Sequence, residues 1–110
     1  MTFEIVVTEP AESDADTIFR WLEDQSERGA QAWSAALLKC LRSLESQASI
    51  YPLAPEAEKS GEPIRQVAFR TPHGRPYRIV YTIRESTVFV LRVRGGTQNW
   101  LGPADIQWPE

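Results

Sequence analysis

The fold is decided by three consecutive runs of sequence: IRQVAF at residues 64–69, YRIVYTI at residues 77–83 and TVFVLRVR at residues 87–94. Each run is rich in β-branched and aromatic residues and is bounded by turn residues, which is typical of β-strands. The short connections between the runs predict three antiparallel strands. Arginine recurs inside these strands, where a guanidinium is rarely placed unless it is solvated, paired or used to bind an anion.

A short strand and a helix are predicted upstream of these runs. Residues 2–7 alternate apolar and polar side chains, as a half-buried strand does. The first helix is expected to begin at residues 8–10, because Pro10 is tolerated in a first turn and acidic residues follow it. An apolar stripe at helical spacing continues until the helix ends near Ser26.

A second helix and a loop complete the chain between the first helix and the meander. Gly29 is interpreted as a helix-stop glycine, so the second helix is predicted over residues 30–47, with one apolar face. Residues 50–63 carry three prolines and are predicted to be a loop rather than a hidden strand.

The predicted order is therefore β-α-α-β-β-β, an α+β fold in which a helical hairpin packs on one face of a small, mainly antiparallel sheet. The other face of the sheet is expected to be open. A length of 110 residues suits one domain, residues 1–110, with a tail that begins at about residue 95.

The charge is divided between the two halves of the chain. Residues 1–60 hold 5 Lys and Arg against 11 Asp and Glu, whereas residues 61–110 hold 7 against 4, giving −6 and +3 and the total of −3. All seven basic residues of the second half are arginines, whose planar fork suits phosphate or carboxylate. Two interpretations stay open: the arginines form a recognition surface, or they pair with the acidic helices.

Strand alternation predicts which arginines share a face. Arg92 and Arg94 lie two residues apart and therefore point the same way, which leaves Leu91 and Val93 to face the core. Arg78 points away from the apolar face of its own strand, so it can join them on the open face. An anion-binding or target-binding surface of Arg78, Arg92 and Arg94, extended by Arg65 on the preceding strand, is the resulting hypothesis.

Other classes of site find little support. His73 lies in a Pro/Gly turn and is interpreted as a solvated turn residue rather than a general acid or base, and Cys40 as a small buried apolar residue rather than a nucleophile. No metal-ligand spacing is present, so no metal or cofactor is expected. No apolar run approaches the ~20 residues that span a bilayer, and the N-terminal residues lack a leader pattern, which predicts a cytoplasmic protein.

Several motifs resemble those of a known family, in the order in which that family carries them. They are TEPA at residues 8–11, LRSL at 41–44, YPLAPE at 51–56, IR at 64–65, YRIVY at 77–81 and VFVLRVR at 88–94. Together they resemble the RelE/ParE superfamily, the toxins of bacterial type II toxin–antitoxin pairs, over nearly the whole chain. The APE loop and the YRIVY strand lean towards the ParE branch.

The resemblance implies a toxin that a cognate antitoxin neutralises by wrapping around it. RelE-like members cut messenger RNA on the ribosome without a metal, and ParE-like members poison DNA gyrase. Arg78 matches the arginine that contacts the scissile phosphate in RelE-like nucleases, but ParE-like relatives carry the same arginine without nuclease activity being implied.

One difference from the family's usual sequence decides which of these activities is the first hypothesis. Where members commonly read VRH followed by a basic segment, this chain reads Val93-Arg94-Gly95 with no later lysine or arginine. Gyrase poisoning is therefore the first hypothesis, and ribosome-dependent mRNA cleavage is the alternative. A degenerate, non-toxic antitoxin-binding module is a third. Trp100 and Trp108 in the tail are predicted either to contact a partner or to fold back on the core.

Overall fold

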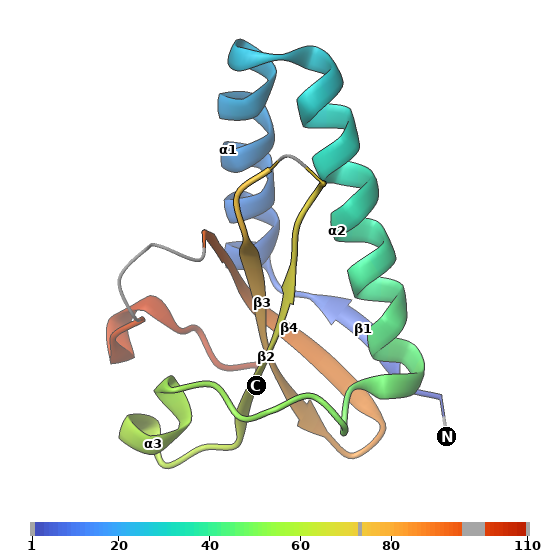
Figure 1. Ribbon diagram of the computed structural model, residues 1–110. Helices are drawn as coiled ribbons and strands as arrows, with labels where there is room; N and C mark the ends of the chain where they lie inside the picture. Colours follow the sequence, from blue (N-terminus) through green and yellow to red (C-terminus); the bar gives the residue numbers. More distant parts are fainter. Residues whose placement is uncertain (1, 73, 96–100, 110) are drawn as a thin grey trace.

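The computed structural model describes residues 2–72, 74–95 and 101–109 of the chain. The elements follow the predicted order, with one short helix added after the helical hairpin (Figure 1). They are β1 (Glu4–Val7), α1 (Glu9–Gln25), α2 (Glu27–Gln47), α3 (Glu56–Ser60), β2 (Ile64–Phe69), β3 (Tyr77–Arg84), β4 (Thr87–Gly95) and a 3-10 turn at Pro103–Asp105. Within the described residues, no helix is long and apolar enough to cross a bilayer.

The helical hairpin is joined at a single residue, Ser26. Its extended backbone ends α1, and its side chain accepts a hydrogen bond from the backbone N–H of Gly29 at 3.1 Å. That bond satisfies one of the free donors at the start of α2. The prediction that Gly29 stops a helix was wrong, because the capping serine starts α2 at Glu27 and places Gly29 in its first turn.

The sheet has the strand order β1-β4-β3-β2. The three strands of the meander pair antiparallel, as predicted, and β1 joins β4 in parallel at the edge of the sheet. The register of β3 and β4 shifts between Val80 and Tyr81, because Val80 faces Arg92 and Tyr81 faces Val90. Leu91 is therefore the extra residue of a β-bulge, a feature that bends a strand and re-aims its side chains.

The main core lies between the sheet and the helical hairpin. Tyr81 is fully buried there, and its hydroxyl donates to the carbonyl of Ala48 at 2.6 Å, so the sheet is tied to the end of α2. Trp33, Phe69 and Tyr77 form a cluster of rings at 5.5–6.0 Å. Such a dense apolar layer supplies most of the stability of a domain of this size.

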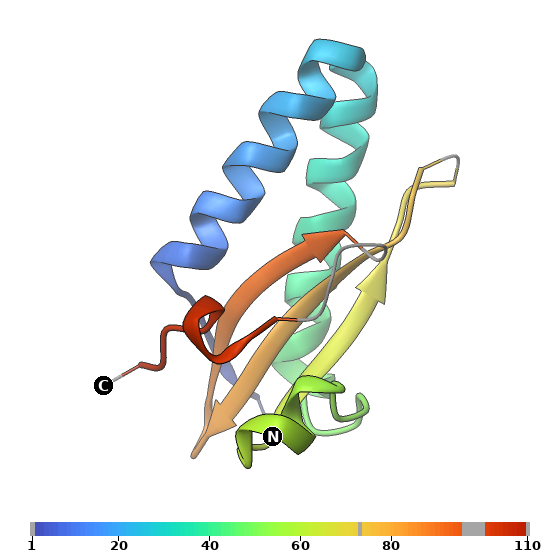
Figure 2. The same cartoon turned by 90° about the vertical axis from the view of Figure 1, so that its left-hand side faces the viewer.

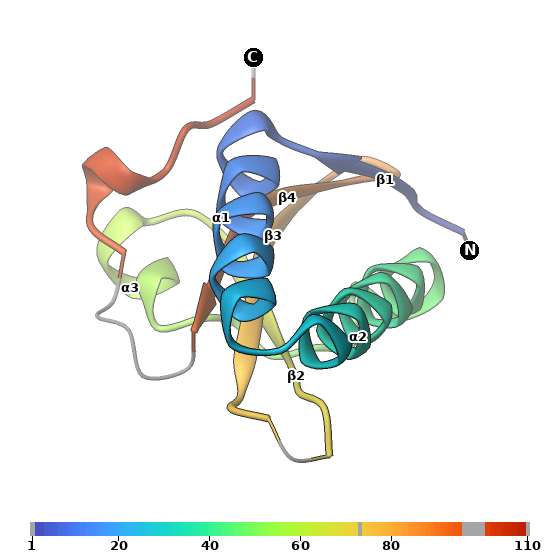
Figure 3. The same cartoon turned by 90° about the horizontal axis from the view of Figure 1, so that it is seen from above.

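A second, smaller layer covers part of the opposite face, which was expected to be open. Leu101 packs there with Ala54, Ile64 and Val80, and α3 lies beside it. Figures 2 and 3 show α3 and the C-terminal segment together on the side of the sheet away from the hairpin. The predicted loop at residues 50–63 thus contains a short helix, because Pro55 begins a turn that Gly61 ends in the left-handed conformation.

Candidate functional site: the arginine face of the sheet

The bulge and the register decide which predicted arginines lie together. Arg78 pairs directly opposite Arg94, and Arg92 lies opposite Val80, so all three side chains belong to the face away from the hairpin. Arg65 pairs with Tyr81 and belongs to the other face, where it donates to the carbonyl of Tyr51 at 2.6 Å. Three of the four arginines therefore share one surface, which we call the arginine face.

Leu91 is fully buried, as predicted, although it is the extra residue of the bulge. Val88, Val90 and Val93 belong to the main core, and Leu91 is the residue at which the alternation changes. Without that extra residue, strict alternation would have placed Val90 on the same face as Arg92 and Arg94. Val93 faces the core as predicted.

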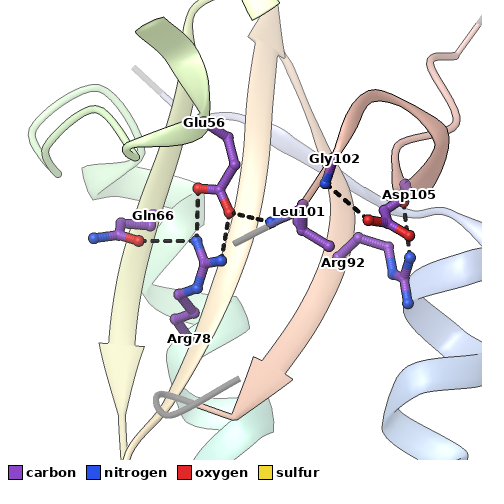
Figure 4. A network of polar contacts seen from close by, with 7 residues as sticks. All are labelled: Glu56, Gln66, Arg78, Arg92, Leu101, Gly102 and Asp105. Carbon is purple, nitrogen blue, oxygen red and sulfur yellow. Dashed lines mark hydrogen bonds and ion pairs between the residues drawn. The ribbon is translucent and has the colours of Figure 1, made fainter. Parts of the chain in front are cut away.

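Arg78 is the most enclosed of these arginines, at 7% exposure. Its guanidinium forms a fork with the carboxylate of Glu56, with N–O distances of 2.9 and 2.5 Å, and it also donates to the side-chain oxygen of Gln66 at 3.1 Å (Figure 4). A bidentate pair of this kind uses the geometry that would otherwise hold a phosphate. In this structure the carboxylate of Glu56 takes that position on the guanidinium of Arg78.

Glu56 stays charged although it is 3% exposed. Burial by itself would raise its pKa, but hydrogen bonds from Arg78 and from the backbone N–H of Leu101 outweigh that effect and hold the pKa below its ordinary value. The Leu101 bond measures 3.0 Å. One carboxylate thus joins α3, β3 and the start of the C-terminal segment.

Arg92 is paired with the first helix. Its guanidinium forms a second fork with Asp14 of α1 at 2.6 and 2.7 Å, and Asp14 also accepts from the backbone N–H of Val93 at 3.0 Å. Because β1 pairs with β4 only as far as Val90, this carboxylate satisfies an edge donor that the ladder leaves open. Pairing with the acidic helices, one of the two open interpretations, thus describes Arg92.

The C-terminal segment lies along the arginine face and is also held by arginines. Arg92 donates to the carbonyl of Asp105 at 2.8 Å, and Arg84 donates to the carbonyl of Pro109 at 2.6 Å. Arg84 also lies 6.0 Å from the centre of the Trp108 ring, which is partly buried against the smaller core. Trp108 thus folds back on the sheet, while Trp100 and His73 lie outside the described residues.

The residues that sequence reasoning missed are the acidic partners, Glu56 and Asp14, together with Arg84. Glu56 belongs to the APE motif, but nothing in its local sequence indicates that it forms an ion pair with Arg78. The acidic first half and the arginine-rich second half gave a general signal of pairing without naming the pairs.

Cys40 is buried, and burial raises the pKa of its thiol to about 11. A thiol with so high a pKa is a poor nucleophile at neutral pH. Within residues 2–72, 74–95 and 101–109, no group of three His, Cys, Asp or Glu side chains gathers closely enough to hold a metal ion.

A second feature lies where the helical hairpin extends past the sheet. A hollow of about 320 Å³ opens between the hairpin and the β2–β3 turn, lined by Trp21, Trp33, Arg75 and Tyr77, and we call it the hairpin groove. Trp21 is 53% exposed. The indole N–H of Trp33 is buried and has no hydrogen-bond partner among the described residues. Exposed aromatic residues around an apolar hollow are typical of protein-binding surfaces.

Comparison with known proteins agrees with the fold and with the motifs. The strand, two helices and three strands are those expected of a RelE/ParE-type toxin. A family model described as the ParE toxin of the type II toxin–antitoxin system, parDE, matches residues 5–100. The chain therefore belongs to the ParE toxin family, and its family implies a cognate antitoxin as partner. A search of curated proteins gave no match.

Proposed function

We propose that this ParE-family toxin inhibits growth by binding and poisoning DNA gyrase in the cytoplasm, until its cognate antitoxin neutralises it. The observation that favours this activity over mRNA cleavage is the fork between Glu56 and Arg78. A catalytic arginine has to stabilise charge that develops on phosphate oxygens. Arg78 already faces a carboxylate, which would repel that phosphate.

The remaining arginines support a binding role better than a catalytic one. Arg92 is engaged by Asp14, and Arg65 lies on the opposite face of the sheet. Arg94, at the end of β4, is partly exposed and is the arginine that we propose contacts the target directly. An overall charge of −3 also gives little long-range attraction to the polyanionic ribosome.

The experiment that tests this function compares two purified systems at equal toxin concentration. One contains gyrase with supercoiled DNA, and the other is a reconstituted translation mix with a labelled mRNA. We expect stabilised gyrase–DNA breaks and an intact message. Cleaved mRNA with no gyrase–DNA breaks would overturn the proposal in favour of the ribonuclease. Neither effect, with tight antitoxin binding, would show a non-toxic binding module.

We further propose that the antitoxin docks in the hairpin groove. Trp21 offers an exposed aromatic surface, and the buried indole N–H of Trp33 has no acceptor among the described residues, so a partner could supply one. Arg75, at the rim, is exposed and lines the hollow beside Tyr77, so a carboxylate on the partner would be attracted to it.

A further inference from the structure

We propose that the toxin holds DNA gyrase partly through a surface at the end of the molecule opposite the tip of the helical hairpin (Figures 1 and 2). This surface consists of Ile50, Leu53, Glu58 and Glu62 with the hollow beside Leu53, and we call it the loop patch. It binds a basic segment of the gyrase surface that handles DNA, one that carries a leucine-sized side chain between cationic residues. The inference deepens the proposed function and rests on it for the identity of the partner.

The loop patch exposes two large aliphatic side chains to water. Ile50 is 75% exposed and Leu53 is 55% exposed, the two highest values among the large hydrophobic residues that the structure describes. They lie three residues apart in the loop between α2 and α3. Exposed apolar side chains that gather in one place mark sites at which a protein contacts a partner. The loop patch is therefore a candidate contact surface.

The backbone beneath Leu53 is fixed, although its side chain is exposed. On one side of it, the N–H of Ala54 donates to the carbonyl of Ile64 in β2 at 2.7 Å. On the other side, the carbonyl of Pro52 accepts from the N–H of Gln66 at 3.1 Å. A side chain displayed on a fixed backbone loses little conformational freedom when a partner binds, so more of its contact energy becomes affinity.

A hollow of about 610 Å³ opens beside Leu53. Much of its wall is formed by small apolar residues, which are Ala54, Pro55, Ala57 and Pro63. Gly61 ends α3 with a φ of 72° and leaves one side of the hollow open, because a Cβ atom at this position would meet no other atom within 4 Å. A leucine-sized side chain of a partner therefore has room to enter the hollow and to pack against Leu53.

The rim of the hollow is acidic. Glu58 and Glu62 line it, both are exposed, and neither forms an ion pair within the part of the chain that the structure describes. Lys59, the basic residue of α3, lines a separate hollow to which the C-terminal segment also contributes. Glu56 already pairs with Arg78. The loop patch thus presents two carboxylates without counter-ions around an apolar centre, which complements a lysine or arginine on the partner.

The charge of the loop patch selects a DNA-handling protein surface as its occupant. An enzyme that binds duplex DNA carries lysine and arginine on the surface that meets the phosphates. The carboxylates of Glu58 and Glu62 attract such a surface and repel a nucleic acid or an anionic bilayer. Residues 1–60 hold 5 basic against 11 acidic side chains, a net charge of −6 that adds long-range attraction to the same basic partner.

Binding of the full chain to purified gyrase tests the apolar part of the loop patch. We expect Leu53→Ser to weaken the affinity by about tenfold at low and at high salt, because it removes the side chain that the partner packs against. Leu38→Ser, at a leucine of similar exposure on α2, is the matched control and should leave the affinity unchanged. If circular dichroism shows that Leu53→Ser unfolds the chain, Ile50→Ser takes its place.

The salt dependence of the same binding tests the acidic rim. Glu58→Gln combined with Glu62→Gln should weaken the affinity by about fivefold at low salt and much less at high salt, where ions screen the charges of the wild type. Glu23→Gln combined with Asp24→Asn removes two exposed acids of α1 and is the matched control. This control should change the affinity by less than about twofold, because its charges lie outside the loop patch.

The remaining outcomes separate this inference from the proposed function. A wild type that binds gyrase no better than Leu53→Ser does would overturn the loop patch and leave gyrase poisoning standing. A wild type that does not bind gyrase would overturn both, because the occupant would then be wrong. Antitoxin binding to Leu53→Ser should equal that of the wild type, since the hairpin groove lies at the other end of the molecule. A matching loss of antitoxin binding would show that the loop patch belongs to the antitoxin, which would overturn the inference.

Discussion

Different interactions hold the two faces of the sheet together. The hairpin side is a continuous apolar layer whose buried members include Leu44, Ile79 and Tyr81, and its polar contacts include the hydrogen bond from Tyr81 to Ala48. The arginine face has a small apolar cluster, and carboxylates and carbonyls hold it together. Apolar packing on the hairpin side stabilises the domain. On the arginine face, each buried charge needs its partner of opposite sign.

The largest effect is expected at Glu56. Glu56→Ala leaves Arg78 buried without its counter-ion, which typically costs about 3–5 kcal/mol. Urea denaturation of the purified chain measures this loss. Glu58→Ala, on the exposed side of the same helix, is the matched control and should change the free energy of unfolding by less than about 0.5 kcal/mol. Equal effects of the two variants would show that the ion pair contributes nothing.

The second prediction compares a leucine from each face. Leu44→Ala, in the main core, should cost about 2–5 kcal/mol because the cavity it leaves cannot collapse. Leu101→Ala, at 5% exposure, should cost only about 1 kcal/mol or less, because the C-terminal segment is held by side chains rather than by a ladder and such segments open locally at low free energy. The readout is the denaturant midpoint of each variant. A loss at Leu101 as large as that at Leu44 would remove the distinction between the faces.

The third prediction concerns the distal end of the hairpin, where the apolar side of the molecule stays uncovered. Trp21→Ala should weaken antitoxin binding by about 1–2 kcal/mol, on the order of tenfold. Leu38→Ala, at a residue of similar exposure on α2 outside the groove, should leave binding unchanged. Calorimetric titration of each variant with the antitoxin gives the comparison. Similar losses for both variants would place the contact elsewhere.

The smallest effect is the pH dependence of the arginine face. The pKa of Glu56 lies below its ordinary value near 4.5, so the stability it contributes is present above pH 4.5 and is lost as the pH falls through the lowered pKa. We expect the free energy of unfolding of the wild type to fall more steeply in that acid range than that of Glu56→Gln. Denaturation at several pH values between 7 and 3 gives both curves, and parallel curves would argue against the linkage.

Sequence periodicity predicted one face well and the other only in outline. The apolar alternation of β1 and β3 and the helical stripes correctly placed the hairpin, the meander and the main core. Two local features escaped it: the capping role of Ser26, which starts α2 early, and the bulge at Leu91. Both depend on single hydrogen bonds or on register, which a periodic pattern does not encode.

The candidate site was harder to predict because it depends on contacts between distant residues. Alternation correctly grouped Arg78, Arg92 and Arg94, but the hypothesis also added Arg65. Along its own strand Arg65 alternates into the same face as Val67 and Phe69, which pack in the main core. The partners Glu56 and Asp14 are 22 and 78 residues from the arginines they bind. The arginine surface predicted from the sequence is therefore, in the fold, a surface on which Arg78 and Arg92 bind acidic residues of the same chain.

Replacing the ion pair of Glu56 and Arg78 by apolar residues, and then measuring toxicity, tests directly whether Arg78 is structural. A chain with both Glu56→Met and Arg78→Met keeps similar volume and leaves neither charge unpaired, so it should fold. Growth after tightly controlled induction is compared with the wild type, and circular dichroism of the purified variant confirms the fold. We expect the folded double variant still to arrest growth, because Arg78 is structural. A folded double variant that no longer arrests growth, beside a toxic wild type, would show that Arg78 acts on the target or on a phosphate.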